Sequence, residues 1–336
     1  VVIAIVALRV PESRDENAAP GIDWSGALLA TIGLGALVYG LIRVQLPNGL
    51  LDGGAFIAVG VAVLVAFVFA QRRARHPMLP LTMFRARAFT IANLYTFALY
   101  MALGGGLYFF PYMLIDVQKY APTAAGAAFL PFVVLQFTLS RWSGGLVARI
   151  GARTPLVVGG AIAGCAFVAY AVPGIGGSYW TTYFPAVSLL GVGAAFFIAP
   201  LTTTVFDSSD PALSGLASAV NNAIARSAGL VAIALFGILF AGVFAGGFDG
   251  RLQHAHVSSA TRALANAERA LFTAGTVPPD VPARDRDAVE LAVRSGYLAG
   301  FRAVMFASAG VAFLAALIAF LALPGRRREA ADAALA

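Results

Sequence analysis

The run GLASAVNNAIARSAGLVAIALFGILFAGVFAG, from Gly215 to Gly246, decides the fold. Arg226 is its one charged residue, and the run exceeds the roughly 20 residues that a helix needs to cross the hydrocarbon core of a bilayer. Lipid offers no hydrogen bonds, so such a run must form a helix or part of a closed barrel. Barrel strands are about ten residues long and alternate in polarity, and this run does neither. It predicts a transmembrane helix.

Other runs along the chain have the same character, and the composition agrees with them. Hydrophobic residues make up 60% of the chain and charged residues 12%, whereas soluble domains have about 45–50% and roughly 25%. The sequence therefore predicts an all-α transmembrane protein. Length and helix-breaking residues give these spans: 24–45, 53–71, 88–115, 123–147, 154–173, 180–205, 215–246 and 298–323.

The net charge of +7 comes from arginines that cluster at alternate joints between the spans. Positive residues mark cytoplasmic loops, so this pattern indicates membrane orientation rather than a nucleic-acid partner. It places the C-terminus in the cytoplasm of a multi-pass protein of the cell (inner or plasma) membrane. The joint near Asp207 and Asp210 lacks basic residues. The marked joints hold Arg72, Arg73, Arg75, Arg85 and Arg87, then Arg149 and Arg153, then Arg326, Arg327 and Arg328.

The spans and joints define an order of segments. Val1–Leu8 is apolar but too short to span, so we interpret 1–8 as the tail of a truncated transmembrane helix and the sequence as a C-terminal fragment. The remaining predicted segments are a cytoplasmic linker (9–23), a transmembrane hairpin (24–71), a cytoplasmic basic loop (72–87), five helices of a bundle (88–246), a long extracytoplasmic loop (247–297), the last transmembrane helix (298–323) and a cytoplasmic tail (324–336).

The span 215–246 carries the most informative polar set. Ser218, Asn222 and Arg226 lie at i, i+4 and i+8, which puts them on one helix face, with Asn221 beside them. A charge inside the bilayer costs at least ~2.5–3.5 kcal/mol, so Arg226 should face protein or a water-filled cavity. The set is either a cavity wall that contacts substrate or a gating partner, or a structural arginine bonded to neighbouring helices.

Acidic residues are absent from the middle of every predicted span. Proton coupling needs a group that titrates as its surroundings alternate, and a membrane-embedded carboxylate is the usual choice. If the protein is proton-driven, we expect that carboxylate in a missing N-terminal part. The sequence also shows no nucleophile elbow, metal-ligand motif or phosphate-binding loop. We expect no catalytic residue, no metal and no cofactor, and hence no enzyme.

Glycines and prolines mark candidate hinges and a candidate inner gate. A Gly-rich inner loop holds Gly144, Arg149, Gly151 and Arg153, and its basic residues also fit plain positive-inside bias. In the third span, glycines interrupt the helix before Pro111, and Pro200 lies in the sixth span; both are candidate hinges or simple kinks. Those glycines are Gly104, Gly105 and Gly106. In the first span, Gly26, Gly33 and Gly40 predict close packing against another helix.

Further cavity candidates lie in the third and fourth spans. Tyr95 and Tyr100 could stack on flat cationic compounds, with ordinary packing as the alternative reading. Gln136 is the polar candidate of the fourth span.

Several stretches together resemble the fourteen-helix EmrB/QacA-type drug:proton antiporters of the major facilitator superfamily. Ile22-Asp23-Trp24-Ser25-Gly26 is similar to the start of the family's extra central hairpin. Arg75-His76-Pro77-Met78-Leu79-Pro80-Leu81 is similar to its joint into the C-terminal bundle. The set 215–229, with its Asn and Arg residues, resembles its penultimate helix.

This resemblance implies a C-terminal six-helix bundle preceded by a two-helix hairpin. It implies a secondary exporter of small, amphipathic or cationic drug-like compounds, driven by proton antiport. Its partners would be substrate, protons and the lipid bilayer, with a periplasmic adaptor protein as an optional one. Loop 144–153 resembles the superfamily's inner-gate motif, but Ala148 stands where an Asp is typical. Transport of a specific metabolite, an intramembrane enzyme and a non-transporting scaffold are the alternatives.

Overall fold

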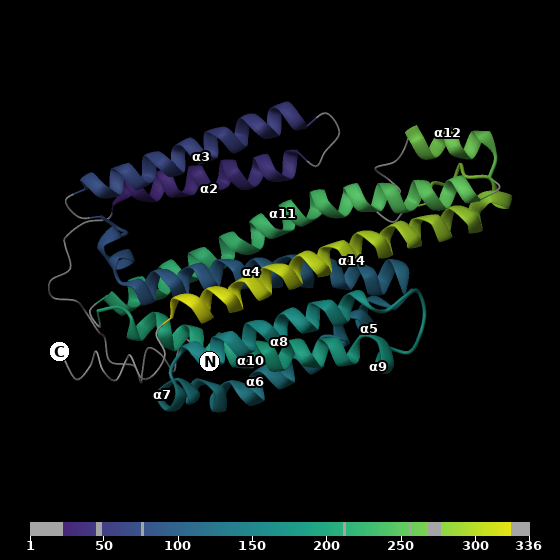
Figure 1. Ribbon diagram of the computed structural model, residues 1–336. Coiled ribbons are helices and arrows are strands. Elements are labelled where there is room, and N and C mark those ends of the chain that lie inside the picture. Colours follow the sequence, from purple (N-terminus) through teal and green to yellow (C-terminus); the bar gives the residue numbers. More distant parts are fainter. Residues whose placement is uncertain are drawn as a thin grey trace, which may run out of the picture.

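A computed structural model describes residues 23–44, 49–74, 77–210, 213–255, 257–267 and 277–323. Three predicted segments fall wholly or mostly outside these described residues: the helix tail 1–8, the linker 9–23 and the C-terminal tail 324–336. Within the described ranges the chain is helical and contains no strand (Figure 1). The all-α fold class predicted from the sequence is confirmed.

The long helices follow the predicted spans, and short helical segments connect several of them. The long helices are α2 (Trp24–Arg43), α3 (Leu50–Arg73), α4 (Arg87–Tyr112), α6 (Leu130–Gly144), α8 (Arg153–Ala171), α10 (Phe184–Asp207), α11 (Ser214–His254) and α14 (Ala283–Ala322). The short segments are η1 (Leu81–Arg85), η2 (Met113–Val117), α5 (Pro122–Ala127), α7 (Leu146–Ile150), α9 (Tyr179–Thr182) and α12 (Ser259–Ala267).

Eight helical segments are long and apolar enough to cross a membrane, counting α5 and α6 as one. Six of them form a bundle in which α4 and α14 are central: α14 packs on α8, α11 and α4, and α11 also packs on α4. At the other side, α10 packs on α8 and α6. The α2–α3 pair stands apart from this bundle and runs beside α11 (Figure 1). This is the predicted six-helix bundle preceded by a hairpin.

Glycines bring α2 and α3 of the hairpin together. A Cβ on Gly40 would lie 2.6 Å from the backbone nitrogen of Ile57, and a Cβ on Gly60 would lie 2.5 Å from that of Leu37. Only glycine permits backbones to approach this closely. Close packing of the glycine face of the first span is thus confirmed, and its partner is α3.

The outer connection differs from the expected long loop over 247–297. Helix α11 continues to His254 and α14 starts at Ala283, so both extend well beyond the predicted ends at 246 and 298. The physical reason is a shared apolar seam outside the predicted spans: Phe248 on α11 and Val289 on α14 are both fully buried. Among the described residues of this segment, the ends of α11 and α14 form a helical hairpin with α12 beside it (Figure 1).

The third and fourth spans also differ locally from expectation. The glycine triplet 104–106 does not interrupt α4, which runs unbroken from Arg87 to Tyr112 and then widens into the π-helical turn η2. The helix continues because neighbouring groups fill the space beside the glycines: a Cβ on Gly106 would lie 2.3 Å from the Phe167 ring. The fourth span is divided between α5 and α6 at residues 128–129.

Candidate functional site

A polar junction joins α4 and α11 in their inner halves. The side-chain amide of Asn221 on α11 donates to Thr96 Oγ1 at 2.7 Å and to Asn93 Oδ1 at 3.2 Å. Both α4 residues are buried, with exposed fractions of 0% for Thr96 and 3% for Asn93. Each also donates to a carbonyl of its own helix, Asn93 to Phe89 and Thr96 to Ala92. The hydrogen bonds of the junction therefore fix α11 against α4.

The predicted polar face of α11 lies next to this junction but points away from it. Asn222 donates only to the backbone oxygen of Ser218, at 3.0 Å, and weakly to its hydroxyl. Asn222 and Arg226 are exposed, and Ser218 is half-buried. The structure thus keeps Ser218, Asn222 and Arg226 on one face, whereas Asn221 faces α4 instead.

Arg226 lies twelve residues beyond the start of α11 at Ser214. At ~1.5 Å per residue this is about 18 Å along the helix, well inside a bilayer of about 30 Å. Arg226 has no carboxylate within ion-pair distance among the described residues. A permanent cation at this depth needs water, an anion or a polar partner. The face can therefore bind a polar or charged molecule.

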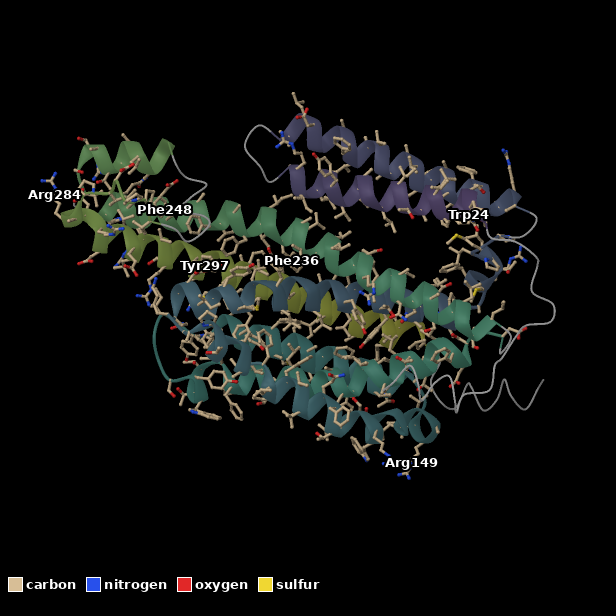
Figure 2. The ribbon with its side chains drawn as sticks, turned by 180° about the vertical axis from the view of Figure 1, so that it is seen from behind. Trp24, Arg149, Phe236, Phe248, Arg284 and Tyr297 are labelled. Carbon is tan, nitrogen blue, oxygen red and sulfur yellow. The ribbon has the colours of Figure 1, made fainter. Side chains whose placement is uncertain are left out.

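Aromatic side chains close the outer half of the same helix. Phe236, Phe240, Phe244 and Phe248 recur at i, i+4 spacing and are all buried. Phe240 stacks on Phe109 of α4 at 5.0 Å between ring centroids and meets the edge of Tyr297 at 4.7 Å. Figure 2 shows Phe236, Phe248 and Tyr297 along the seam between α11 and α14. These four phenylalanines, the phenylalanine ladder, pack α11 against α4 and α14 on the outer side of the polar face.

The remaining cavity candidates are not brought together with the α11 face. Tyr95 is fully buried and its hydroxyl donates to the Leu156 carbonyl of α8 at 2.7 Å, so it links two helices. Tyr100 is half-buried against the core. Gln136 lies on α6, which packs on α10 rather than on α11. Of these three, Tyr95 has a packing role, which was the alternative interpretation of its sequence position.

The inner loop contains a short helix rather than a simple turn. Gly144 ends α6, and Arg149 lies on α7, where its side chain projects outward (Figure 2). Gly151 follows with φ of +79°, a left-handed conformation that glycine adopts without strain. Arg153 begins α8 and lies over the Phe320 ring of α14 at 4.4 Å. Among the described residues, none of these groups forms an ion pair.

The hinge candidates are packing positions in this conformation. A Cβ on Gly104 would lie 2.6 Å from the Gly229 Cα, and a Cβ on Gly105 would overlap the Phe236 ring. Pro111 comes two residues before η2, and Pro200 is buried within the unbroken helix α10. Such positions couple the helices that they contact, so motion about them would repack α4 against α11.

Two arginines of α14, which the sequence reading passed over, bind helix ends. Arg302 donates to the carbonyls of Ala171, Val172 and Pro173, where α8 ends. Arg294 donates to the Val117 carbonyl at 2.6 Å, where η2 ends. Helix C-termini leave carbonyls without partners and carry partial negative charge, which explains the choice of arginine. The sequence did contain a signal for this role: Arg302 is a basic residue within the predicted apolar span 298–323.

The polar face of α11 offers the chemistry of a binding surface. Its groups are hydrogen-bond donors and acceptors and one permanent cation. Among the described residues, no group of three or more His, Cys, Asp and Glu is placed to hold a metal ion.

Comparison with known proteins bears on identity. The Major Facilitator Superfamily model matches residues 1–234. The tetracenomycin C resistance and export protein of Streptomyces glaucescens is 26% identical over 92% of this chain and 58% of its own length. The lincomycin resistance protein of Streptomyces lincolnensis is 31% identical over 70% of this chain and 49% of its own. The chain thus spans about half the length of these relatives.

A solved structure shares the fold. The bacterial homologue of the human lysosomal transporter Spinster, in an inward-facing and unoccupied conformation, superposes with a TM-score of 0.50. The match covers 89% of this chain and 64% of the other, at 18% identity. A family model that matches most of the chain and a shared helical fold together identify it: this chain belongs to the Major Facilitator Superfamily.

Proposed function

We propose that the chain belongs to a secondary exporter of small drug-like compounds, amphipathic or cationic, which works by alternating access and is driven by proton antiport. The α2–α3 hairpin before the six-helix bundle supports placing it in the fourteen-helix EmrB/QacA type. The names of the relatives support drug export: one is a resistance and export protein for tetracenomycin C, and another confers lincomycin resistance.

One structural observation carries the proposal: the exposed face of Ser218, Asn222 and Arg226 on α11. It lies at membrane depth, beside a bonded junction that keeps α11 in place. Transporters of this kind bind substrate near the midplane, between two halves that rock against each other. A hydrogen-bonding face with one fixed cation suits a compound with polar groups. A passive scaffold would have no use for a polar face at that depth, and an intramembrane enzyme would need an acid/base or metal constellation beside it.

Orientation follows from the arginines. Arg72, Arg85 and Arg87 lie at the ends of α3, η1 and α4, and Arg149 lies on α7 beyond the end of α6. Their side is the cytoplasm by the positive-inside rule, which also puts the C-terminus there. A periplasmic adaptor protein, if the exporter uses one, would meet the opposite end, where α11 and α14 project with α12.

The test is ethidium efflux from cells that produce the whole protein. We expect Arg226→Ala to slow efflux about tenfold, because the variant loses a charged hydrogen bond to a gating partner, which contributes about 1.5–3 kcal/mol. Ethidium is itself a cation and would not accept that bond. The amount of protein in the membrane should not change, since Arg226 is exposed. Arg141→Ala, which removes an exposed arginine of α6, is the matched control. Equal efflux in both variants would remove Arg226 from the mechanism.

Proton coupling needs its own measurement. Dissipating the proton gradient with an uncoupler should stop efflux of ethidium from wild-type cells. Efflux that continues after the gradient collapses contradicts antiport. A protein that moves one metabolite and ignores ethidium and other cationic dyes would contradict the drug-like substrate class while leaving transport in place.

A further inference from the structure

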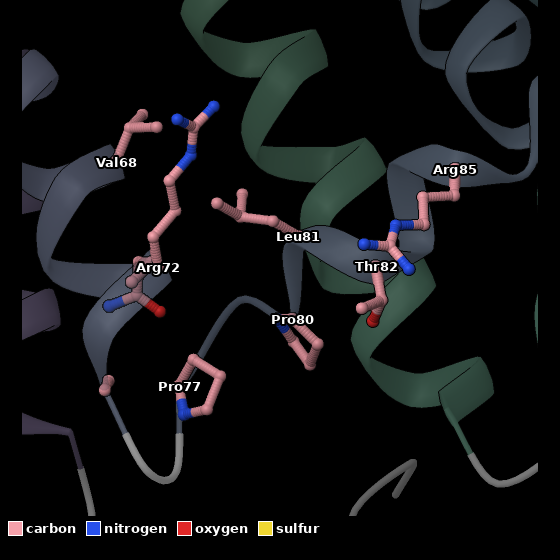
Figure 3. Close-up of a pocket in the computed structure, with 9 residues that line it drawn as sticks. Val68, Arg72, Pro77, Pro80, Leu81, Thr82 and Arg85 are labelled. Carbon is pink, nitrogen blue, oxygen red and sulfur yellow. The ribbon is translucent and has the colours of Figure 1, made fainter.

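A cavity of about 680 Å³ opens between the inner end of the hairpin and the start of the bundle. Helix α3 forms one wall with Val68 and Arg72, and the other wall comes from Pro80, Leu81 and Arg85 at η1 (Figure 3). The cavity is far from the polar face of α11 in the chain and shares no residue with it. Its lining combines apolar side chains with two arginines.

The Arg72 guanidinium lies 5.9 Å from the centroid of the Phe69 ring, and neither arginine is paired with an acidic residue in the part of the chain that the structure describes. Both arginines are exposed. Asp23, the acidic residue near this end of α3, is already occupied: it accepts from Gln71 at 2.6 Å and from its own helix start at Gly26. Two cations across one cavity repel each other unless an anion lies between them. The cavity therefore presents two positive charges that can bind an anion.

The direction of Arg72 indicates what kind of anion fits. Side chains of a helix lean toward its N-terminus, and the N-terminus of α3 lies across the membrane. Figure 3 shows the Arg72 guanidinium level with Val68, beside Leu81, and the Arg85 guanidinium beside Thr82. The Arg72 charge thus lies against apolar side chains at the membrane boundary. An anion that carries its own apolar chains matches both parts of this lining.

The walls are built and held in position. Gln71, buried at the inner end of α3, accepts from the Leu79 backbone at 2.9 Å and donates to Asp23. This bridge ties α2, α3 and the segment before η1 together. The cavity is consequently a fixed feature of the joint between hairpin and bundle.

From this geometry we propose that the Arg72–Arg85 cavity binds a phosphate-bearing anion, and that its occupant is the headgroup of an anionic phospholipid from the inner leaflet. The guanidiniums bind the phosphate oxygens, which arginine does with two parallel hydrogen bonds. Val68 and Leu81 contact the acyl chains. The lipid thereby bridges the hairpin and the six-helix bundle. This site is independent of the proposed transport function.

The test is native mass spectrometry of the purified full chain in neutral detergent, titrated separately with phosphatidylglycerol and phosphatidylcholine of identical acyl chains. We expect one phosphatidylglycerol to bind at least tenfold more tightly than phosphatidylcholine, since each basic residue near a lipid surface contributes roughly a factor of five. Arg72→Gln with Arg85→Gln should abolish that preference. The control pair Arg73→Gln with Arg141→Gln removes equal charge at exposed positions outside the cavity and should retain it.

Two further arms make the result decisive. Inorganic phosphate is titrated against bound phosphatidylglycerol: displacement at millimolar concentration would show that the site takes soluble phosphate, which contradicts the lipid as occupant. Arg72→Lys with Arg85→Lys keeps the charge and should keep most of the preference, which guards against misfolding of the glutamine pair. Equal affinity for the two lipids in the wild type, or equal loss in the control pair, overturns the proposal.

Discussion

The two halves of α11 differ in the polarity and burial of their side chains. The inner half presents Ser218, Asn222 and Arg226 outward and touches α4 through hydrogen bonds of Asn221. The outer half buries a ladder of phenylalanines from Phe236 to Phe248 against α4 and α14. One continuous helix thus carries a polar, exposed segment and a dry, aromatic one.

The difference separates two tasks. Aromatic packing buries large areas and is costly to disrupt, so the outer half holds the bundle together. Hydrogen bonds between membrane helices contribute less on average, so the inner half can exchange partners more cheaply. A helix of this kind could turn a polar face toward different surroundings without losing its anchor. The following predictions measure how unequal the halves are.

The largest effect is expected in the outer half. Phe244 is fully buried, and Phe244→Ala should lower the free energy of unfolding by about 3 kcal/mol or more, because the cavity it leaves collapses only partly. Leu239→Ala is the control on the same helix, since Leu239 is 37% exposed, and should stay within about 0.5 kcal/mol. Denaturant unfolding in detergent measures both. Equal losses would mean that the ladder does not anchor α11.

A smaller effect is expected at the polar junction. Asn221→Ala removes two hydrogen bonds to α4 and should cost about 1 kcal/mol of unfolding free energy. Asn222→Ala is its neighbour and matched control: that amide bonds only within α11, so its removal should cost a few tenths. The same unfolding assay applies. A cost for Asn222→Ala as large as that for Asn221→Ala would show that the exposed face, too, is structural.

Sequence alone was enough for the general fold. Apolar length and arginine position predicted the membrane helices, and the glycine spacing of α2 predicted a close helix pair. The polar face on α11 also followed, because i, i+4 spacing fixes which side chains share a face. These features depend on one helix at a time, which is why they could be read from residues.

Relations between helices were harder to predict. Asn221 differs from Asn222 in role only because α11 is rotated so that one amide meets Asn93 and Thr96, and no pattern within one helix gives that rotation. The glycine triplet of α4 was expected to break the helix, since nothing local revealed the Phe167 and Phe236 rings beside it. The helical extension beyond 246 did have a signal, the i, i+4 phenylalanines, but the hydrophilic residues of 247–297 suggested a loop.

The smallest effect is expected at the tip, where the aromatic half of α11 projects beyond the predicted spans. Asp285, at the start of α14 and outside the membrane-spanning part, accepts from Ser258 and from Thr261 at the start of α12. These hydrogen bonds, the one from the Ser258 hydroxyl first, lower the pKa of Asp285 to about 2. Because the folded pKa lies below the usual carboxyl value of 3.8, this contribution is complete above about pH 4 and is lost as the pH falls through 2.

Hydrogen exchange of the α12 amides tests that contact. Asp285→Ala should lower their protection at pH 6 about tenfold, while protection around Phe244 stays unchanged, because only the local attachment is lost. Wild-type α12 should lose protection in the same way as the pH approaches 2, after correction for intrinsic exchange. Asp287→Asn, an exposed neighbour, is the control. If Asp285→Ala also lowered protection around Phe244, the α12 contact and the buried phenylalanines of α11 would unfold as one cooperative unit. The outer half of α11 would then depend on α12 for part of its stability.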